Sequence, residues 1–429
     1  MRDCHRPPEG PLMRLTKIVD YALWALVMLT LARTTVLVRQ RDTSDFDTVD
    51  FSATFAIVVI ASILVALVLH PRGRNTLMQL RESSALILLI FLIYGAASAM
   101  WSDFSTFVLF RAGEVLAVMG ALFVLMEGYK NWQNAERAML VVLMVATLMG
   151  VAQRVILAGI SVEGLHTNIY TVTAGMGFLY ALGESLRADP QRRRRLRRWA
   201  AAFAFFVVIG TSAGSNIAVA AGMLILLPFL SRSKLVIIPA ALACMAVIVI
   251  MGTSEDVVSV TLLSGRSLED VQTMTGRTNL WTAYWNAFLE KPILGHGFAI
   301  VARLGDQFGT VATTNAHNGF IDALAGLGVL GFLTMLIYSI KLVTEALRAS
   351  RAQIAGGLGC LAAFVMMLVN NNSKSILGGS YDPVVVGVFA MLAFFHIFTL
   401  RAMQAQERDN RNAPPAVPEP AGGATAAHP

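Results

Sequence analysis

The sequence predicts an all-α polytopic membrane protein with about twelve transmembrane helices, both termini on the inner side, and one large outer loop between spans nine and ten. The 429 residues are 56% hydrophobic and only 14% charged, whereas about a quarter of the residues in a soluble globular chain are charged. Apolar stretches near the length that crosses about 30 Å of hydrocarbon recur along the chain. Most Lys and Arg lie in short segments between these stretches, a pattern of membrane topology rather than of nucleic-acid binding.

The apolar stretches place the predicted spans along most of the chain. They cover residues 18–38, 53–70, 84–100, 108–127, 135–157, 167–186, 199–212, 214–230, 235–253, 318–341, 354–372 and 383–400. The stretch 199–230 is too long for one untilted helix, and Gly210 and Gly214 interrupt it together with the polar residues between them. We therefore predict two helices that are joined at the outer surface.

The distribution of positive charge supports this division. With the N-terminus inside, most of the 34 Lys and Arg fall in inner segments on both sides of the division. The densest group, residues 192–198, is interpreted as a stop signal that also touches anionic lipid headgroups. No small-residue cleavage site follows the first span, so we predict that this helix is retained as an uncleaved start signal.

The predicted domain organisation consists of one domain and a tail. Residues 1–401 form a single transmembrane domain, and residues 402–429 end in a stretch rich in Pro, Ala and Gly that predicts a disordered inner tail. The three cysteines are scattered and predict neither a disulfide framework nor a metal site. The one long outer loop, at about 254–317, is the expected place for chemistry.

The middle of this loop, residues 277–290, predicts an amphipathic helix. Apolar and aromatic side chains recur there at helical spacing: Leu280, Trp281, Tyr284, Trp285, Phe288 and Leu289. Lys291, Pro292 and Gly295 then end it. Trp and Tyr suit the headgroup boundary, so we expect this helix to lie along the outer leaflet or to cap the bundle.

Arg277 lies in the first turn of that helix. A cation there opposes the helix dipole and costs a few tenths of a kcal/mol unless an anion is present. A helix N-terminus combined with a guanidinium suits a phosphate group. Arg277 is therefore a candidate phosphate ligand, and the alternative is an arginine that only extends to water.

The segment 313–319 opens the tenth span. Asn315 is the expected N-cap, which places His317 in the first turn, where the helix dipole would favour a neutral imidazole. Such a group can accept the proton of a substrate hydroxyl, although a structural histidine is the alternative. Three glycines on the same helix predict a small-residue face for close packing: Gly326, Gly328 and Gly331.

Arg111 lies inside the fourth span, with Glu114 three residues later. Charged residues inside a membrane span indicate function by default. A local ion pair that holds the bundle together is the alternative reading. Glu163 and His166, in an outer loop, are weaker candidates without a spacing argument.

These residues resemble the O-antigen ligase and polysaccharide polymerase superfamily of bacterial inner membranes. The ligase motif is His, then Asn, Ser or Gln, nine residues, Gly, two residues and a small residue. This chain has His317-Asn318, nine residues, Gly328, two residues and Gly331, at the start of the span after the long loop. The topology resembles the family over most of the chain, while the specific motifs are concentrated in 276–331.

Other segments are also similar to the family. Gly276-Arg277 with the Trp-rich helix and the segment 292–297 looks like its periplasmic loop, and Trp101-Ser102 followed by Arg111 is similar to the exopolysaccharide-polymerase branch.

Two departures from the family pattern concern the candidate site. Trp281 stands where the ligases often carry Leu, and Asn216 follows Ser215 where relatives tend to carry a basic residue. If that basic residue clamps pyrophosphate, another must replace it. Arg111, Arg154 and Arg266 are the candidates.

The resemblance implies a metal-independent, inverting glycosyltransferase without a cofactor. Its donor would be a glycan on undecaprenyl pyrophosphate, and its acceptor a sugar hydroxyl on the periplasmic face of the inner membrane. His317 would deprotonate the acceptor, Arg277 with a second Arg would stabilise the pyrophosphate, and Asn318 would contact substrate. Chain-length regulators or export proteins are possible partners, and nucleic acid is not.

The acceptor separates two activities within the family. A polymerase transfers the glycan to another lipid-linked repeat, and a ligase transfers it to lipid A-core. The Trp101–Arg111 stretch and the missing Leu favour the polymerase. A twelve-helix secondary transporter is the remoter alternative, but the single long loop breaks the symmetry of two similar halves.

Overall fold

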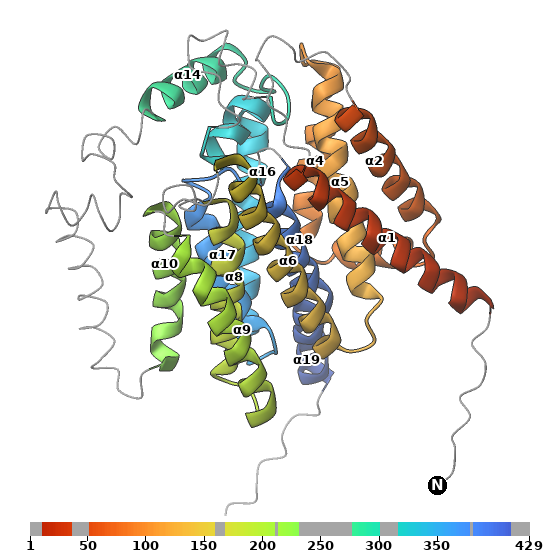
Figure 1. Ribbon diagram of the computed structural model, residues 1–429, viewed down its shortest axis with the longest axis vertical. Coiled ribbons are helices and arrows are strands. Elements are labelled where there is room, and N and C mark those ends of the chain that lie inside the picture. Colours follow the sequence, from red (N-terminus) through yellow and green to blue (C-terminus); the bar gives the residue numbers. More distant parts are fainter. Residues whose placement is uncertain are drawn as a thin grey trace, which may run out of the picture.

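The computed structural model describes residues 11–36, 51–158, 168–210, 213–230, 277–300, 316–377 and 381–412. Within these ranges the chain forms helices and no strand, so the predicted all-α class is confirmed for them. The helices form a bundle, and one helix, α14, lies across its end (Figure 1).

The first half of the bundle begins with two helices whose surfaces are largely exposed and continues with better buried ones. Its elements are α1 (Pro11–Val36), α2 (Phe51–Leu69), α3 (Gly73–Leu80), α4 (Ala85–Ala97), the 3-10 turn η2 (Ser98–Met100), α5 (Ser105–Glu127) and α6 (Trp132–Ala158). Helix α2 packs on α1 and α5, while α5 also contacts α4 and α18.

The second half contains the central helix of the fold. Its elements are α8 (Asn168–Ser185), α9 (Pro190–Ile209), α10 (Ala213–Leu230), α14 (Arg277–Glu290), α16 (Gly319–Arg351), α17 (Gly357–Asn370), α18 (Pro383–Phe394), the π-helix η4 (Phe395–Leu400) and α19 (Arg401–Asn412). Every residue of α18 is buried, and the helix packs against α5, α6 and α8. A helix that is apolar all round belongs in the interior, and α18 occupies it.

Helix length and composition identify an integral membrane protein. Six helices among the described residues are long and apolar enough to cross a membrane, and the count is seven if α3 and α4, bent by 106°, form one span. A helix lies at each predicted span that the structure describes, and the predicted ninth span, 235–253, falls outside those residues. Exposed apolar side chains such as Val68 and Ile337 suit contact with lipid.

The stretch 199–230 divides as predicted into two helices, α9 and α10. Helix α9 begins earlier than expected, at Pro190, because the Asp189 side chain accepts hydrogen bonds from the backbone N–H groups of Gln191 and Arg192. The arginine run therefore lies on the first turns of α9 and not in a connecting loop.

The predicted disordered tail starts too early in the chain. Residues 402–412 belong to α19, which continues from η4 without a break. Met403 is buried, and Gln404 donates to the Glu82 carbonyl at 3.3 Å. These contacts order the start of the segment, while residues 413–429 lie outside the described part.

Buried ion pairs join four helices at the end of the bundle where α9 begins. Arg192 contacts both Glu136 of α6, at 2.5 Å, and Glu184 of α8, at 2.8 Å. Arg195 lies 3.0 Å from the same Glu136. Glu184 also accepts from the backbone N–H of Gly356, at 2.9 Å, just before α17. The buried carboxylates are thus neutralised and fully bonded, as their burial requires.

Candidate functional site

Helix α16 is capped by Asn318, and the predicted cap at Asn315 was wrong. The side-chain oxygen of Asn318 accepts from the backbone N–H groups of Phe320 at 3.0 Å and Ile321 at 3.3 Å. Asn315 lies outside the described residues. Gly319 follows the cap and leaves no room for a side chain, because a Cβ there would come within 2.3 Å of Asn371.

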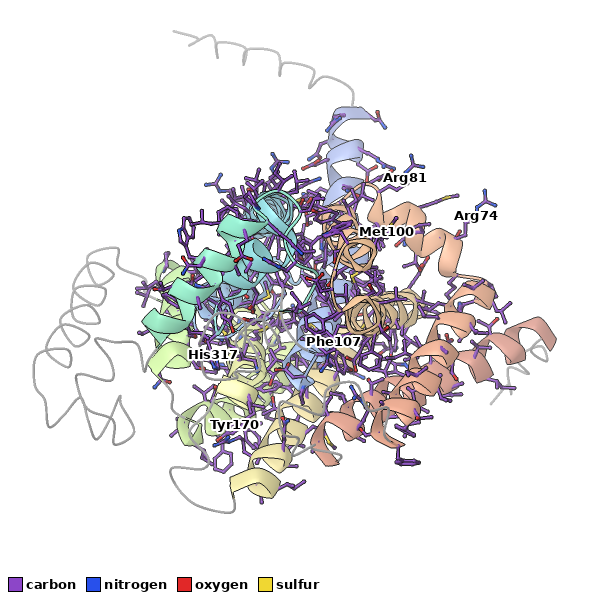
Figure 2. All side chains as sticks on the ribbon, turned by 90° about the horizontal axis from the view of Figure 1, so that it is seen from above. Arg74, Arg81, Met100, Phe107, Tyr170 and His317 are labelled. Carbon is purple, nitrogen blue, oxygen red and sulfur yellow. The ribbon has the colours of Figure 1, made fainter. Side chains whose placement is uncertain are left out.

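His317 therefore precedes the helix and does not lie in its first turn. It is half-buried, with a φ of 54° in the left-handed region. The prediction that the helix dipole favours a neutral imidazole assumed a first-turn position, so it no longer applies. Seen along the bundle, His317 lies beside α14 (Figure 2). The α14 packing on α16 brings the loop helix and the histidine together.

Ala316, just before His317, is bonded on both its backbone polar groups. Its N–H donates to the Asp322 carboxylate at 3.0 Å, and its carbonyl accepts from the Trp281 indole N–H at 2.9 Å. Ala316 is fully buried. Trp281, which departs from the family pattern, thus fastens α14 to the segment that carries His317.

Helix α16 breaks at Gly328, where φ is 66° and ψ is −165°. A Cβ at this position would lie 2.2 Å from the Ile293 carbonyl oxygen, so the loop backbone occupies the space of a side chain. The sequence predicted a small-residue face for close packing, and the loop backbone does pack closely at Gly326 and Gly328, but Gly328 also supplies a backbone conformation that breaks the helix. The nine residues between Asn318 and Gly328 are the short helical segment between cap and break.

The loop after α14 closes onto this break through its backbone. The N–H of Gly297 donates to the Gly326 carbonyl at 2.7 Å, and that of Val329 donates to the Pro292 carbonyl at 2.9 Å. The Trp101 indole N–H donates to the Leu294 carbonyl at 3.2 Å from the other side. The segment 292–297 is therefore held between the end of α4 and α16, and Trp101 has a structural partner.

Helix α14 has the bounds that the sequence predicted, and its two faces differ. Leu280 and Tyr284 are buried, whereas Trp285 is 52% exposed and Leu289 is 57% exposed. Because α14 packs on α16 and also presents an apolar outer face, it caps the bundle and suits the lipid boundary.

Arg111 and Glu114 form an ion pair, with Arg111 Nη1 2.9 Å from Glu114 Oε2. This is the local ion pair that the sequence offered as the alternative to a functional role for Arg111. Arg33, near the end of α1, contacts the other oxygen of the same buried carboxylate. The Arg111 guanidinium also lies over the Phe107 ring, 5.3 Å from its centroid. Two cations share one anion, so this cluster holds one positive charge in excess.

For several of the predicted site residues the structure does not describe the side chain. Arg277 opens α14, as predicted, but its side chain is not among the described ones. Arg266, Glu163 and His166 lie outside the described residues. Their predicted roles stay predictions.

Arg154 lies on α6, close enough to Tyr170 of α8 for their charges to interact. The residue before the non-basic Asn216 has a structural role, since the buried Ser215 hydroxyl lies 2.7 Å from that of Thr171. This bond joins α10 to α8 near the position where relatives carry a basic residue.

The sequence analysis did not predict the cluster of buried polar side chains near the start of α16. The amide nitrogens of Asn370 and Asn371 are buried without a hydrogen-bond partner among the described residues, and the buried Asp322 carboxylate has the Ser375 hydroxyl beside it. Such atoms are costly and tend to occur at functional sites. The available signal was Asp322 itself, an acidic residue on a predicted span.

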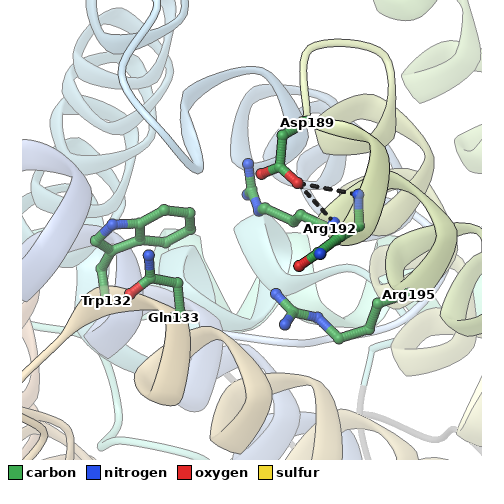
Figure 3. Close-up of a pocket in the computed structure, with 6 residues that line it drawn as sticks. Trp132, Gln133, Asp189, Arg192 and Arg195 are labelled. Atoms are coloured by element: carbon green, nitrogen blue, oxygen red, sulfur yellow. Dashed lines mark hydrogen bonds between the residues drawn. The ribbon is translucent and has the colours of Figure 1, made fainter.

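A pocket of about 290 Å³ lies at the other end of the bundle, and no predicted catalytic or substrate-binding residue lines it (Figure 3). Its lining comes from the starts of α6 and α9: Trp132, Gln133, Asp189, Gln191, Arg192 and Arg195. The Arg192 guanidinium lies over the Trp132 ring, 4.5 Å from the centroid. This pocket belongs to the ion-pair network and is separate from His317.

The described residues contain no group of three or more His, Cys, Asp or Glu side chains that could hold a metal ion. Metal independence of the whole chain remains a prediction.

No curated protein matches the chain. A family model described as O-antigen ligase matches residues 199–336. The matched stretch includes α9, α10, α14 and the part of α16 that carries the cap and the break. It also contains the His317-Asn318 and Gly328 positions from which the resemblance was predicted, and that prediction is confirmed. Residues 199–336 of this chain are similar to the O-antigen ligase family.

Proposed function

We propose that this protein is an inner-membrane glycosyltransferase that polymerises surface polysaccharide from undecaprenyl-pyrophosphate-linked repeat units on the periplasmic face. The observation that carries the proposal is the O-antigen ligase match over residues 199–336, with His317 beside a capped and broken helix. The charge distribution supports twelve spans in one domain, 1–401, with both termini inside and the working loop, about 254–317, outside.

His317 is the general base of this reaction. The acceptor hydroxyl attacks the anomeric carbon of the donor while His317 takes its proton. The new glycosidic bond forms as the bond from that carbon to the pyrophosphate oxygen breaks, which inverts the anomeric centre in a single displacement. Undecaprenyl pyrophosphate leaves with the bonding electrons, and no metal takes part.

Cationic side chains stabilise the leaving pyrophosphate. Arg277 opens α14, where a helix N-terminus adds its own attraction for an anion. Arg111 contributes the excess positive charge of its cluster with Arg33 and Glu114. Arg154 and Arg266 are the further candidates for the pyrophosphate clamp.

Asn318 contacts the substrate through its side-chain amide nitrogen, which the helix cap does not use. Its amide oxygen accepts both cap hydrogen bonds. The amide nitrogen remains to donate to a sugar oxygen.

The polymerase is favoured over the ligase by the Trp101–Arg111 stretch and by Trp281 in place of Leu. Both tryptophans donate to backbone carbonyls around the site, of Leu294 and of Ala316. The ligase activity, with lipid A-core as the acceptor, is the second candidate because the matched family model is described as O-antigen ligase.

Glycan analysis in a strain that lacks this protein tests the proposal. Loss of a polymerase leaves a single repeat on the lipid or core, whereas loss of a ligase leaves long glycan on the carrier lipid. His317→Ala should insert into the membrane normally and lower transfer by about 10²–10⁴. Near-normal glycan from that variant would contradict the assignment of the base.

A further inference from the structure

The backbone at His317 adopts an uncommon conformation. Its φ is 54°, and residues other than glycine seldom occupy this left-handed region, because Cβ crowds the following carbonyl, although Asn, Asp and His do so more often than the rest. Such a residue persists where its surroundings determine the backbone, and it tends to occur at functional sites. The contacts that hold it are therefore informative.

The peptide before His317 is held from two different elements. Asp322 of α16 accepts from the Ala316 N–H at 3.0 Å, and Trp281 of α14 donates to the Ala316 carbonyl at 2.9 Å. Ala316 is 0% exposed, so water cannot replace either partner. Both bonds must be kept for the buried backbone groups to be satisfied.

The residues after His317 are fixed as well. Asn318 caps α16, and the Gly319 N–H donates to the Asn371 carbonyl at 2.8 Å. The backbone on both sides of His317 is thus bonded to α14, α16 and the end of α17.

We infer that Trp281 and Asp322 form a two-sided clamp on Ala316 that holds His317 in its left-handed backbone and so aims the imidazole at the acceptor. They are positioning residues and not catalytic ones. Asp322 lies at an unspecified position within the motif that starts at His317, and Trp281 lies outside that motif. The role of the clamp in transfer rests on the proposed function, but the backbone conformation that it imposes does not.

Substitutions at the clamp test the effect on transfer. Asp322→Ala and Trp281→Phe should each lower glycan transfer in vesicles from the native strain, which hold the endogenous lipid-linked repeat, by about 10–100-fold at unchanged protein abundance. Asp322→Asn keeps an oxygen that accepts from Ala316 and should restore most of the activity. Trp285→Phe, on the exposed face of α14, is the matched control and should change little.

Two outcomes would contradict the proposed role of the clamp. If Asp322→Asn is as inactive as Asp322→Ala, the carboxylate charge matters and not the bond to Ala316. If both Asp322→Ala and Trp281→Phe transfer glycan normally, the clamp does not position the base.

A stability measurement tests the backbone without any substrate. With the clamp intact, His317→Gly should melt higher than His317→Ala, by roughly 1–2 °C, because only glycine is relaxed at a φ of 54°. In the Asp322→Ala background the order should reverse, since a relaxed backbone favours Ala. A higher Tm for His317→Ala with the clamp intact overturns the inference even if the proposed function stands. Full glycan transfer by His317→Ala overturns His317 as the base of the proposed function and leaves the backbone clamp standing.

Discussion

The buried polar groups at the two ends of the bundle differ in how they are bonded. At the arginine end, where α9 begins, the carboxylates of Glu136 and Glu184 are each bonded to several partners from other helices, and Arg195 Nε is a buried atom there without a partner among the described residues. At the loop end, where α14 crosses the bundle, the buried amide nitrogens of Asn370 and Asn371 have no partner among the described residues. Figure 1 places these ends on opposite sides of the molecule.

The backbone conformation also differs between the two ends, being irregular at the loop end and regular at the arginine end. The loop end contains the left-handed His317 and the broken helix at Gly328. At the arginine end, α9 starts with an acidic cap and runs without interruption. Proteins depart from local rules mainly at functional sites, so the comparison supports the proposal that the arginine end is the scaffold and the loop end the working surface.

The largest effect on the scaffold should come from Glu136→Gln. Glu136 is fully buried and faces both Arg192 and Arg195, so the loss of its charge leaves the two arginines with Glu184 as their remaining partner and should cost about 3–5 kcal/mol. We expect low abundance and a lower Tm in detergent, with normal glycan transfer per folded molecule. Glu407→Gln, in an exposed pair with Arg411, is the control and should have no measurable effect. A stable Glu136→Gln protein with impaired transfer would place chemistry at the arginine end.

A smaller effect is expected for Gly328→Ala at the loop end. A backbone with φ 66° and ψ −165° is open essentially only to glycine and costs about 1–3 kcal/mol for another residue, and the added Cβ would also lie 2.2 Å from the Ile293 carbonyl oxygen. Transfer should fall together with stability, because the loop that packs on the break supports the site. Gly113→Ala is the control, since a Cβ at Gly113 meets nothing within 4 Å. Wild-type stability of Gly328→Ala would show that α16 is continuous.

The smallest effect concerns the cap of α9 and depends on pH. Hydrogen bonds from the backbone N–H groups of Arg192 and Gln191 lower the pKa of Asp189 below its ordinary value. The stabilisation is therefore fully present above that ordinary value, near 4, and is lost as pH falls through the lowered pKa. Asp189→Asn keeps a good cap and should flatten the dependence of Tm on pH below about 4. An unchanged acid limb in that variant would contradict the role of the carboxylate.

The sequence was sufficient where one physical signal dominates. Hydropathy located the helices, and the aromatic spacing followed by Lys291-Pro292 gave the bounds of α14. The i,i+3 spacing of Arg111 and Glu114 suggested their ion pair, which the structure contains. Local patterns of this kind need no information from distant parts of the chain.

Tertiary contacts decided the features that were missed. Asn315 and Asn318 are equally good caps by residue type, and the fit of Gly319 against Asn371 distinguishes them. Arg33 joined Glu114 from α1, 81 residues away. A glycine on an apolar helix does not reveal whether it packs or bends, so the break at Gly328 needed the loop backbone beside it.

The break in α16 also limits how the site can open. Three backbone bonds join the segment 292–297 to α16 around Gly328: His296 to Ala325, Gly297 to Gly326 and Val329 to Pro292. Because each buried backbone group left unbonded costs about 1–3 kcal/mol, swinging this segment outward would cost several kcal/mol. We therefore expect this segment to stay in place, so that under the proposed function donor and acceptor reach His317 along a route that does not displace it.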